Sequence, residues 1–352
     1  MTDEDVKDLA MGGTILGGGG GGWPEGGLKT GRLAIEIGEV NLLEPSEAPK
    51  DMLVAVSAGL GAPTQRGETT PRHFIRSAEL LWENGVEFGG FIAAENGGSN
   101  SFAGWIQAAA LGLPVVDAPA DGRAHPTAMM GGMGLHRVEG YVSVKAVACK
   151  EVEAIARGTL QRTSNVARMI AQDTKSLVAM TRDPVTVDYA VKHGALGAIT
   201  KAIELGRAFN KTPKDDPEKR VKAVLREIGG DLVCHGSVAE ITLKAKGGFD
   251  VGALIVEGDS GTFEVTFVNE YMTLEQDGVR LGTFPNLICT FNGEGSPVTS
   301  AAVEKGDEIY LTNTDRDLIP IGDGNRYPEM YKPIEGALGK PMVEYLGGFL
   351  FG

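Results

Sequence analysis

Three short apolar runs in the first third of the chain alternate with two helix-like patterns. The apolar runs are residues 52–58, 88–94 and 114–118, and each ends at polar or glycine-rich residues. Continuous apolar runs of this length are typical of strands that are covered on both faces. Residues 69–85 and 100–113 lie between them and repeat apolar positions at helical spacing. The alternation predicts a parallel sheet with right-handed helical crossovers.

The starts of both predicted helices carry capping signals. Thr70 is the expected N-cap of the first helix, followed at once by a proline, which suits the first helical position. Asn100 or Ser101 is the expected N-cap of the second.

The pattern of apolar and polar residues changes near Gly230. Helical patterns come before it, in residues 149–161, 164–173, 187–211 and 216–230. Alternating or β-branched runs broken by glycine follow it, as in short strands. The sequence therefore predicts an α/β N-terminal domain with a largely parallel sheet over residues 1–230. A mainly β domain over residues 231–352 is expected to follow, with a C-terminal tail that packs back.

Composition and charge narrow the function classes. Hydrophobic residues make up 42% and charged residues 23% of the 352 residues, as in ordinary globular proteins. The net charge of −14 argues against a nucleic-acid partner and against an anionic membrane surface. The three cysteines are far apart, the acidic start lacks a secretory pattern, and no apolar run is long enough to span a membrane. We therefore expect a cytoplasmic protein.

Glycine-rich polar segments follow all three predicted strands. They are residues 59–64, 95–101 and 117–126. Ligands of open parallel sheets bind beyond the carboxyl ends of the strands. We therefore expect these segments to meet at one edge of the sheet.

The segment DAPADGRAHP, residues 117–126, contains four side chains that could take part in catalysis or ligand binding. Asp117 or Asp121 could act as a general base, and Arg123 could hold an anionic group with two hydrogen bonds. Asp121 and His125, with Glu95 nearby, could bind a divalent metal ion. A salt-bridged turn without catalytic function explains the same residues equally well.

A second candidate is the segment ENGGSN at residues 95–100. Gly97 and Gly98 allow close approach of a ligand to the backbone, and Glu95, Asn96 and Asn100 add polar contacts. The alternative is a tight connection between a strand and a helix. The six glycines at residues 17–22 formally satisfy a dinucleotide motif, but no helix is expected to begin after them, so no nucleotide cofactor is expected.

Several blocks of this sequence resemble the S-methyl thiohydantoin desulfurase-like family. They are the glycines at 17–22, GLGAP at 59–63, ENGGSNS at 95–101, LGLPVVDAPADGRAHP at 111–126, GAITKAIELGRA at 197–208, FVNEYM at 267–272 and FPNLICTFNGEGSPVTS at 284–300. The family usually reads DADGMGRAFP where this chain reads DAPADGRAHP, so His125 inherits no family role.

The resemblance implies a hydrolase that removes sulfur from a hydantoin-like ring by means of activated water. Asp117, Asp121 and Arg123 are its expected catalytic residues. The alternative is a non-catalytic ligand-binding or partner subunit, because family members occur near hydantoinase and oxoprolinase genes. Either a homo-oligomer or a hydantoinase-type partner is compatible with this picture.

Overall fold

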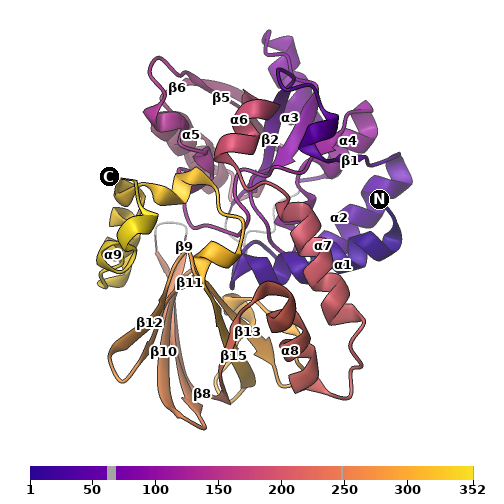
Figure 1. The fold of residues 1–352 in the computed structure, drawn as a ribbon. Coiled ribbons are helices and arrows are strands. Elements are labelled where there is room, and N and C mark those ends of the chain that lie inside the picture. The colour runs from indigo at the N-terminus through magenta and orange to yellow at the C-terminus, as the bar shows by residue number, and fades with distance from the viewer. Residues whose placement is uncertain (62–68, 247–248, 352) are drawn as a thin grey trace.

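Two sheets organise the chain. The structure, a computed structural model, describes residues 1–61, 69–246 and 249–351. Figure 1 shows the first sheet with its helices, coloured indigo to pink, beside a second sheet of orange strands. The predicted fold class, an α/β region followed by a mainly β region, is confirmed. The division into domains at residue 230 falls between the last long helix and the first strand of the second sheet, and it stays a prediction.

The first sheet has seven strands within the described residues, in the order β1-β4-β3-β2-β7-β5-β6. The strands are β1 (Leu42–Leu43), β2 (Leu53–Leu60), β3 (Gly90–Ala93), β4 (Val115–Val116), β5 (Ser143–Ala148), β6 (Glu153–Gly158) and β7 (Val178–Thr186). The predicted strands β2, β3 and β4 pair in parallel, as expected. The strands β7, β5 and β6 extend the sheet in antiparallel fashion.

The predicted helix over residues 149–161 is wrong. This segment forms the strand β6 and the start of the next helix. Strand β6 lies at the edge of the sheet, and its side chains are mostly half-buried or exposed. The apolar residues of an edge strand need not alternate strictly with polar ones. The alanines and charged residues of β6 therefore give a pattern that is also typical of a helix.

Nine α-helices lie in the described residues. They are α1 (Asp3–Gly17), α2 (Pro24–Ile37), α3 (Pro71–Glu83), α4 (Trp105–Leu111), α5 (Leu160–Asp173), α6 (Val187–His193), α7 (Ala198–Asn210), α8 (Pro217–Ile228) and α9 (Lys332–Leu338). Thr70 is the N-cap of α3, as predicted. The caps predicted for α4 are wrong, because residues 100–102 form a 3-10 turn and the helix begins after Gly104.

Helix α2 was not expected. It starts with Pro24 at its first turn, directly after the glycines at residues 17–22. These glycines therefore join two helices, α1 and α2, and no strand precedes them as the dinucleotide motif requires. No helix in the described parts of the chain is both long enough and apolar enough to cross a bilayer.

The second sheet is antiparallel, with eight strands among the described residues in the order β12-β11-β10-β9-β8-β15-β13-β14. The strands are β8 (Asp231–Lys246), β9 (Phe249–Gly258), β10 (Gly261–Val268), β11 (Glu270–Gln276), β12 (Val279–Thr283), β13 (Leu287–Asn292), β14 (Pro297–Val298) and β15 (Glu308–Thr314). The hydroxyls of Tyr271 in β11 and Thr290 in β13 lie 2.8 Å apart, although these strands are not neighbours. The sheet is therefore strongly curved and encloses its own apolar core.

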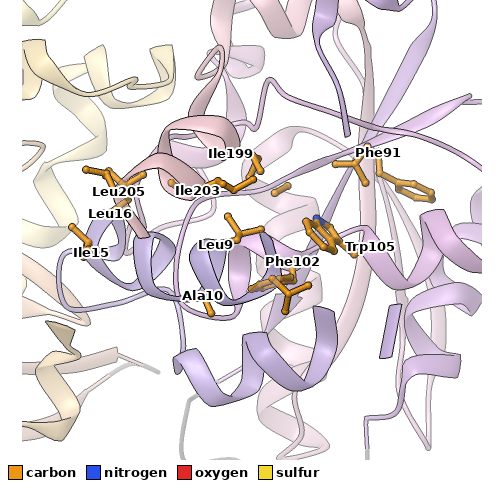
Figure 2. Close-up of a cluster of buried hydrophobic side chains, with 14 of the residues drawn as sticks. Leu9, Ala10, Ile15, Leu16, Phe91, Phe102, Trp105, Ile199, Ile203 and Leu205 are labelled. Carbon is orange, nitrogen blue, oxygen red and sulfur yellow. The ribbon is translucent and has the colours of Figure 1, made fainter. Parts of the chain in front are cut away.

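Helices α1 and α7 cross with their backbones in contact. A Cβ atom added to Gly12 would lie 1.7 Å from the carbonyl oxygen of Ala202, and one added to Gly206 would lie 1.7 Å from that of Asp8. Figure 2 shows the apolar cluster around this crossing, with Leu9 and Leu16 of α1 and Leu205 of α7 among its labelled side chains. The contact positions the C-terminal end of α1, where the glycines begin.

We expect Gly206→Ala to destabilise the protein, because its methyl group has no room against the backbone of α1. Overpacking of this kind costs about 1–3 kcal/mol. Gly336→Ala is the matched control, since its Cβ would meet nothing within 4 Å in α9 and alanine favours helix. Urea unfolding of both variants measures the difference, and equal stability of the two would contradict the packing argument.

Candidate active site

Two glycine-rich loops meet at the carboxyl ends of β3 and β4. The loop of residues 17–22, termed the glycine loop below, packs on residues 95–101. The carbonyl oxygen of Gly21 accepts hydrogen bonds from the backbone N–H groups of Ser99 at 3.2 Å and Asn100 at 3.1 Å. Of the segments expected to converge, residues 95–101 and 117–126 meet, through a 3.1 Å hydrogen bond from Asn96 to the carbonyl of Gly122. Residues 62–64 of the third lie outside the described residues.

Glycine is required at the contact between these loops. A Cβ atom on Gly21 would lie 2.4 Å from the Cα of Gly97, and a Cβ on Gly97 would lie 2.3 Å from the Cα of Gly21. Gly21 also adopts a positive φ of 76°. The two backbones can therefore touch and exclude water from the side chains beneath them.

Asp117 binds the start of α7. Its carboxylate accepts hydrogen bonds from the backbone N–H groups of Ile199 at 2.8 Å and Thr200 at 3.0 Å. These N–H groups have no partner within the helix, and the helix dipole favours a negative charge there. Both carboxylate oxygens are thus used in orienting α7.

Asp121 is fully buried and connects the loop to the C-terminal tail. One carboxylate oxygen accepts from the backbone N–H groups of Gly122 at 2.8 Å and Gly322 at 3.1 Å. The other accepts from Nδ2 of Asn325 at 2.7 Å and lies 3.3 Å from Nδ1 of His125. Asp121 therefore fastens the tail to the α/β region beside the imidazole.

His125 lies between two carboxylates. Its Nδ1 is 2.9 Å from Oε2 of Glu95, and its backbone N–H donates to the same oxygen at 3.1 Å. Burial alone would lower the pKa of His125, but the charges of Glu95 and Asp121 outweigh burial and raise it to about 10. Burial would raise the pKa of Glu95, and the facing imidazolium lowers it instead. At neutral pH the pair is therefore ionic.

The residues predicted to bind substrate make internal contacts. Asn100 donates to Glu95 at 2.6 Å, and Asn96 donates to the carbonyl oxygens of Gly122 and Ala198. The N–H of Gly97 donates to the hydroxyl of Ser101 at 3.0 Å. The N–H groups of Ser99 and Asn100 donate to the carbonyl of Gly21. Substrate binding by residues 95–100, Gly98 included, stays a prediction.

Arg123 is wholly buried, with hydrogen-bonding capacity to spare. Its Nη1 donates to the carbonyl oxygens of Pro285, at 3.1 Å, and Asn286, and the guanidinium lies 4.4 Å from the ring centroid of Phe284. Among the described residues, Nε and Nη2 have no hydrogen-bond partner. Burial lowers the pKa of Arg123 to about 10, so the side chain is still a cation at neutral pH.

Glu270 is a buried carboxyl that was not among the predicted site residues. It opens β11, and a Cβ atom on Gly20 would lie 2.0 Å from its Oε1. Burial, with a further contribution from Glu95, raises the pKa of Glu270 to about 8 although His125 and Arg123 oppose the shift. No local motif marks it, because only the packing of the second sheet against the glycine loop brings it here. Its presence in the FVNEYM block was the one available signal.

A second buried ion cluster lies next to His125. Lys145 and Arg182 both bind the carboxylate of Asp183, and Arg182 also donates to the carbonyl of Gly131 at 3.0 Å. A Cβ atom on Gly131 would lie 2.4 Å from Nε2 of His125. The cluster therefore supports the backbone that packs against the imidazole.

The predicted metal ligands, Asp121 and His125, form an ion pair in this structure. A ligating imidazole must be neutral, whereas the two carboxylates hold His125 in its cationic form. Within the described ranges, no group of three or more His, Cys, Asp or Glu side chains is arranged to hold a metal ion. Metal binding stays a prediction, and no step below depends on it.

Comparison with known families identifies both halves of the chain. The family model described as "S-Me-THD-like, N-terminal domain" matches residues 4–154, and "S-Me-THD-like, C-terminal domain" matches residues 159–314. These segments include the loops at 17–22, 95–101 and 117–126 as well as Glu270. A search of curated proteins finds no match.

Among solved structures, a protein from Chromobacterium violaceum has a similar fold. Its crystal structure superposes with a TM-score of 0.69 and 18% sequence identity, covering 100% of this chain and 98% of the other. The likeness at this identity shows a shared fold.

We expect Asp117→Ala to lower the stability of the protein by about 1–2 kcal/mol, because two N–H groups of α7 lose their acceptor. Asp216→Ala is the control. Asp216 is an exposed N-cap of α8 that accepts one such bond, from Lys219 at 3.0 Å, so its loss should cost less. Chemical unfolding compares the two. A smaller loss for Asp117→Ala would show that its carboxylate does not stabilise α7.

Proposed function

Because the chain belongs to the S-Me-THD-like family, we propose that it is a hydrolase that removes sulfur from a thiohydantoin or a closely related ring. The observation that carries this proposal is the buried guanidinium of Arg123. Its free Nε and Nη2 groups lie in one electrostatic cluster with ionised and ionisable acids. A buried cation with unused donors suits a ligand that develops negative charge during the reaction.

The reaction exchanges sulfur for oxygen at an amidine-like ring carbon. Water adds to this carbon, the carbon–sulfur bond breaks, and a carbonyl group and a thiol are formed. Of the two protons of water, one ends on the ring nitrogen and the other on the departing sulfur. The reaction therefore needs a base for water, an acid for the leaving group, and a cation beside the ring atom that gains charge.

Arg123 and His125 supply the two cationic functions. Arg123 stabilises the negative charge on the ring through Nε or Nη2. His125, kept protonated by Glu95 and Asp121, gives a proton to the leaving sulfur. Its pKa of about 10 is near that of a thiol, about 8.5 for a cysteine side chain, and similar values favour this transfer. The ionic pair with Glu95 thus keeps the acid in its active form.

Asp117 and Asp121 act in this proposal as positioning residues. The oxygens of Asp117 bind the start of α7, and those of Asp121 bind the tail and face His125. The side chain of Glu95 is 12% exposed, so solvent reaches the cluster from that side.

The direct test is incubation of the purified protein with a panel of thiohydantoins, S-methylated and unmethylated, with thiol or sulfide release as the readout. We expect release that a chelator does not abolish, because the proposed steps use side chains alone. Release that is lost on chelation and restored by a divalent ion would replace these steps with a metal-dependent mechanism. No release from any member of the panel would favour the non-catalytic partner subunit, or a different ring substrate.

Arg123→Lys tests the role of the guanidinium. Lysine keeps the charge but loses the planar donors, so we expect kcat to fall roughly 100- to 1,000-fold. Arg168→Lys is the control, since Arg168 contacts the ring of Phe249 instead of the site. Turnover of Arg123→Lys close to that of the wild type would remove Arg123 from the mechanism.

A further inference from the structure

Glu270 belongs to the second sheet, but its carboxyl interacts with charged residues of the α/β region, namely Glu95, Arg123 and His125. Glu270 is 3% exposed, and among the described residues its Oε2 has no hydrogen-bond partner. The chain reverses direction at Asn269, which has a φ of 59° and separates β10 from β11. This turn directs Glu270 towards the glycine loop.

The glycine loop is fastened on both sides of the Glu270 carboxyl. The carbonyl of Gly18 accepts from the N–H of Tyr271 at 2.8 Å, and that of Gly19 accepts from the N–H of Ser300 at 2.9 Å. Gly20, between these contacts and the Gly21 contact, has no side chain, and the carboxyl fills the space that a Cβ atom would need. The position of the carboxyl is therefore set by backbone on both sides.

With Glu270 protonated, the charges of Glu95 and Asp121 match those of Arg123 and His125, and ionisation of Glu270 adds one negative charge to this group of residues. The groups that act on its titration are Glu95, which opposes ionisation, and His125 and Arg123, which favour it. Glu270 is thus the one acid of these three that can exchange a proton without breaking an ion pair.

We propose that Glu270 is the general base that takes the proton from the attacking water. This role deepens, and rests on, the proposed desulfurase function. Its unpartnered Oε2 accepts the proton as the new carbon–oxygen bond forms. The proton then passes to the ring nitrogen, and the second proton of water replaces the one that His125 gave to the sulfur, so both residues are ready for the next cycle. The second sheet thereby completes an active site whose cations come from the first.

The test compares Glu270→Gln with Glu257→Gln, an exposed glutamate in strand β9 of the same sheet. We expect Glu270→Gln to lose at least about 100-fold in kcat. Binding of the hydantoin product, measured by calorimetry, should change by no more than a few fold. Glu257→Gln should match the wild type in both measurements.

The pH profile of the wild-type protein gives a second measurement that does not depend on a variant. The base must be ionised and His125 must be protonated, so kcat/KM should rise through about pH 8 and fall above about pH 10. In Glu270→Gln the rise near pH 8 should be absent from the residual activity.

The pH dependence of the protein's stability measures the ionisation of Glu270 independently of turnover. The folded-state pKa of Glu270 lies above its ordinary value. The stability that its protonated form contributes is therefore fully present below about pH 4.5 and is lost as pH rises through about 8. Glu270→Gln should melt above the wild type at about pH 9, and the gap should close towards about pH 5.

The outcomes separate this inference from the function on which it rests. Full turnover by Glu270→Gln, or a wild-type profile without a rise near pH 8, would overturn the role of Glu270 and leave the desulfurase function standing. Absence of turnover in the wild type would overturn the proposed function and, with it, this role. A melting temperature of Glu270→Gln that follows the wild type at every pH would show that the carboxyl does not titrate as required.

Discussion

The backbone contact between Gly21 and Gly97 holds the glycine loop over the buried side chains of the site. Gly21 and Gly97 approach so closely that neither could carry a Cβ atom, and Gly20 leaves its space to a carboxyl. This closure covers charged side chains that would otherwise be hydrated. Because burying an ion is costly unless it is paired, an acid beneath the loop must find a partner or become protonated. The crossing of α1 and α7 in turn places the glycine loop.

The pattern of ionisation follows from that enclosure. His125 and Glu95 remain charged because each faces the other at 2.9 Å, whereas Glu270 has no such partner and becomes a weak acid. Arg123 keeps its charge with donors unused. Two acids in one buried cluster are thus driven to different protonation states, which is how a single site comes to hold both a proton donor and a base. Such a site costs stability, and this cost is expected where function requires it.

Local sequence signals were sufficient for part of this arrangement. Three apolar runs ending in polar glycine-rich turns predicted the parallel strands β2, β3 and β4, and hence the convergence of the loops that hold Glu95 and His125. The strand β6 was missed because an edge strand need not alternate. Glu270 carried no local signal: its environment is made by a contact between the glycine loop and β11, about 250 residues apart in sequence. The residue types at 117–126 suggested catalysis for Asp117, while its two hydrogen bonds to α7 depend on a helix that only tertiary packing brings near.

A crystal structure of the protein with the hydantoin product would locate the bound ring. We expect the ring beneath the glycine loop, in contact with the free nitrogens of Arg123 and the carboxyl of Glu270. A ring bound instead in the cavity of about 940 Å³ lined by residues of α1, α7 and α8 would rule out this site.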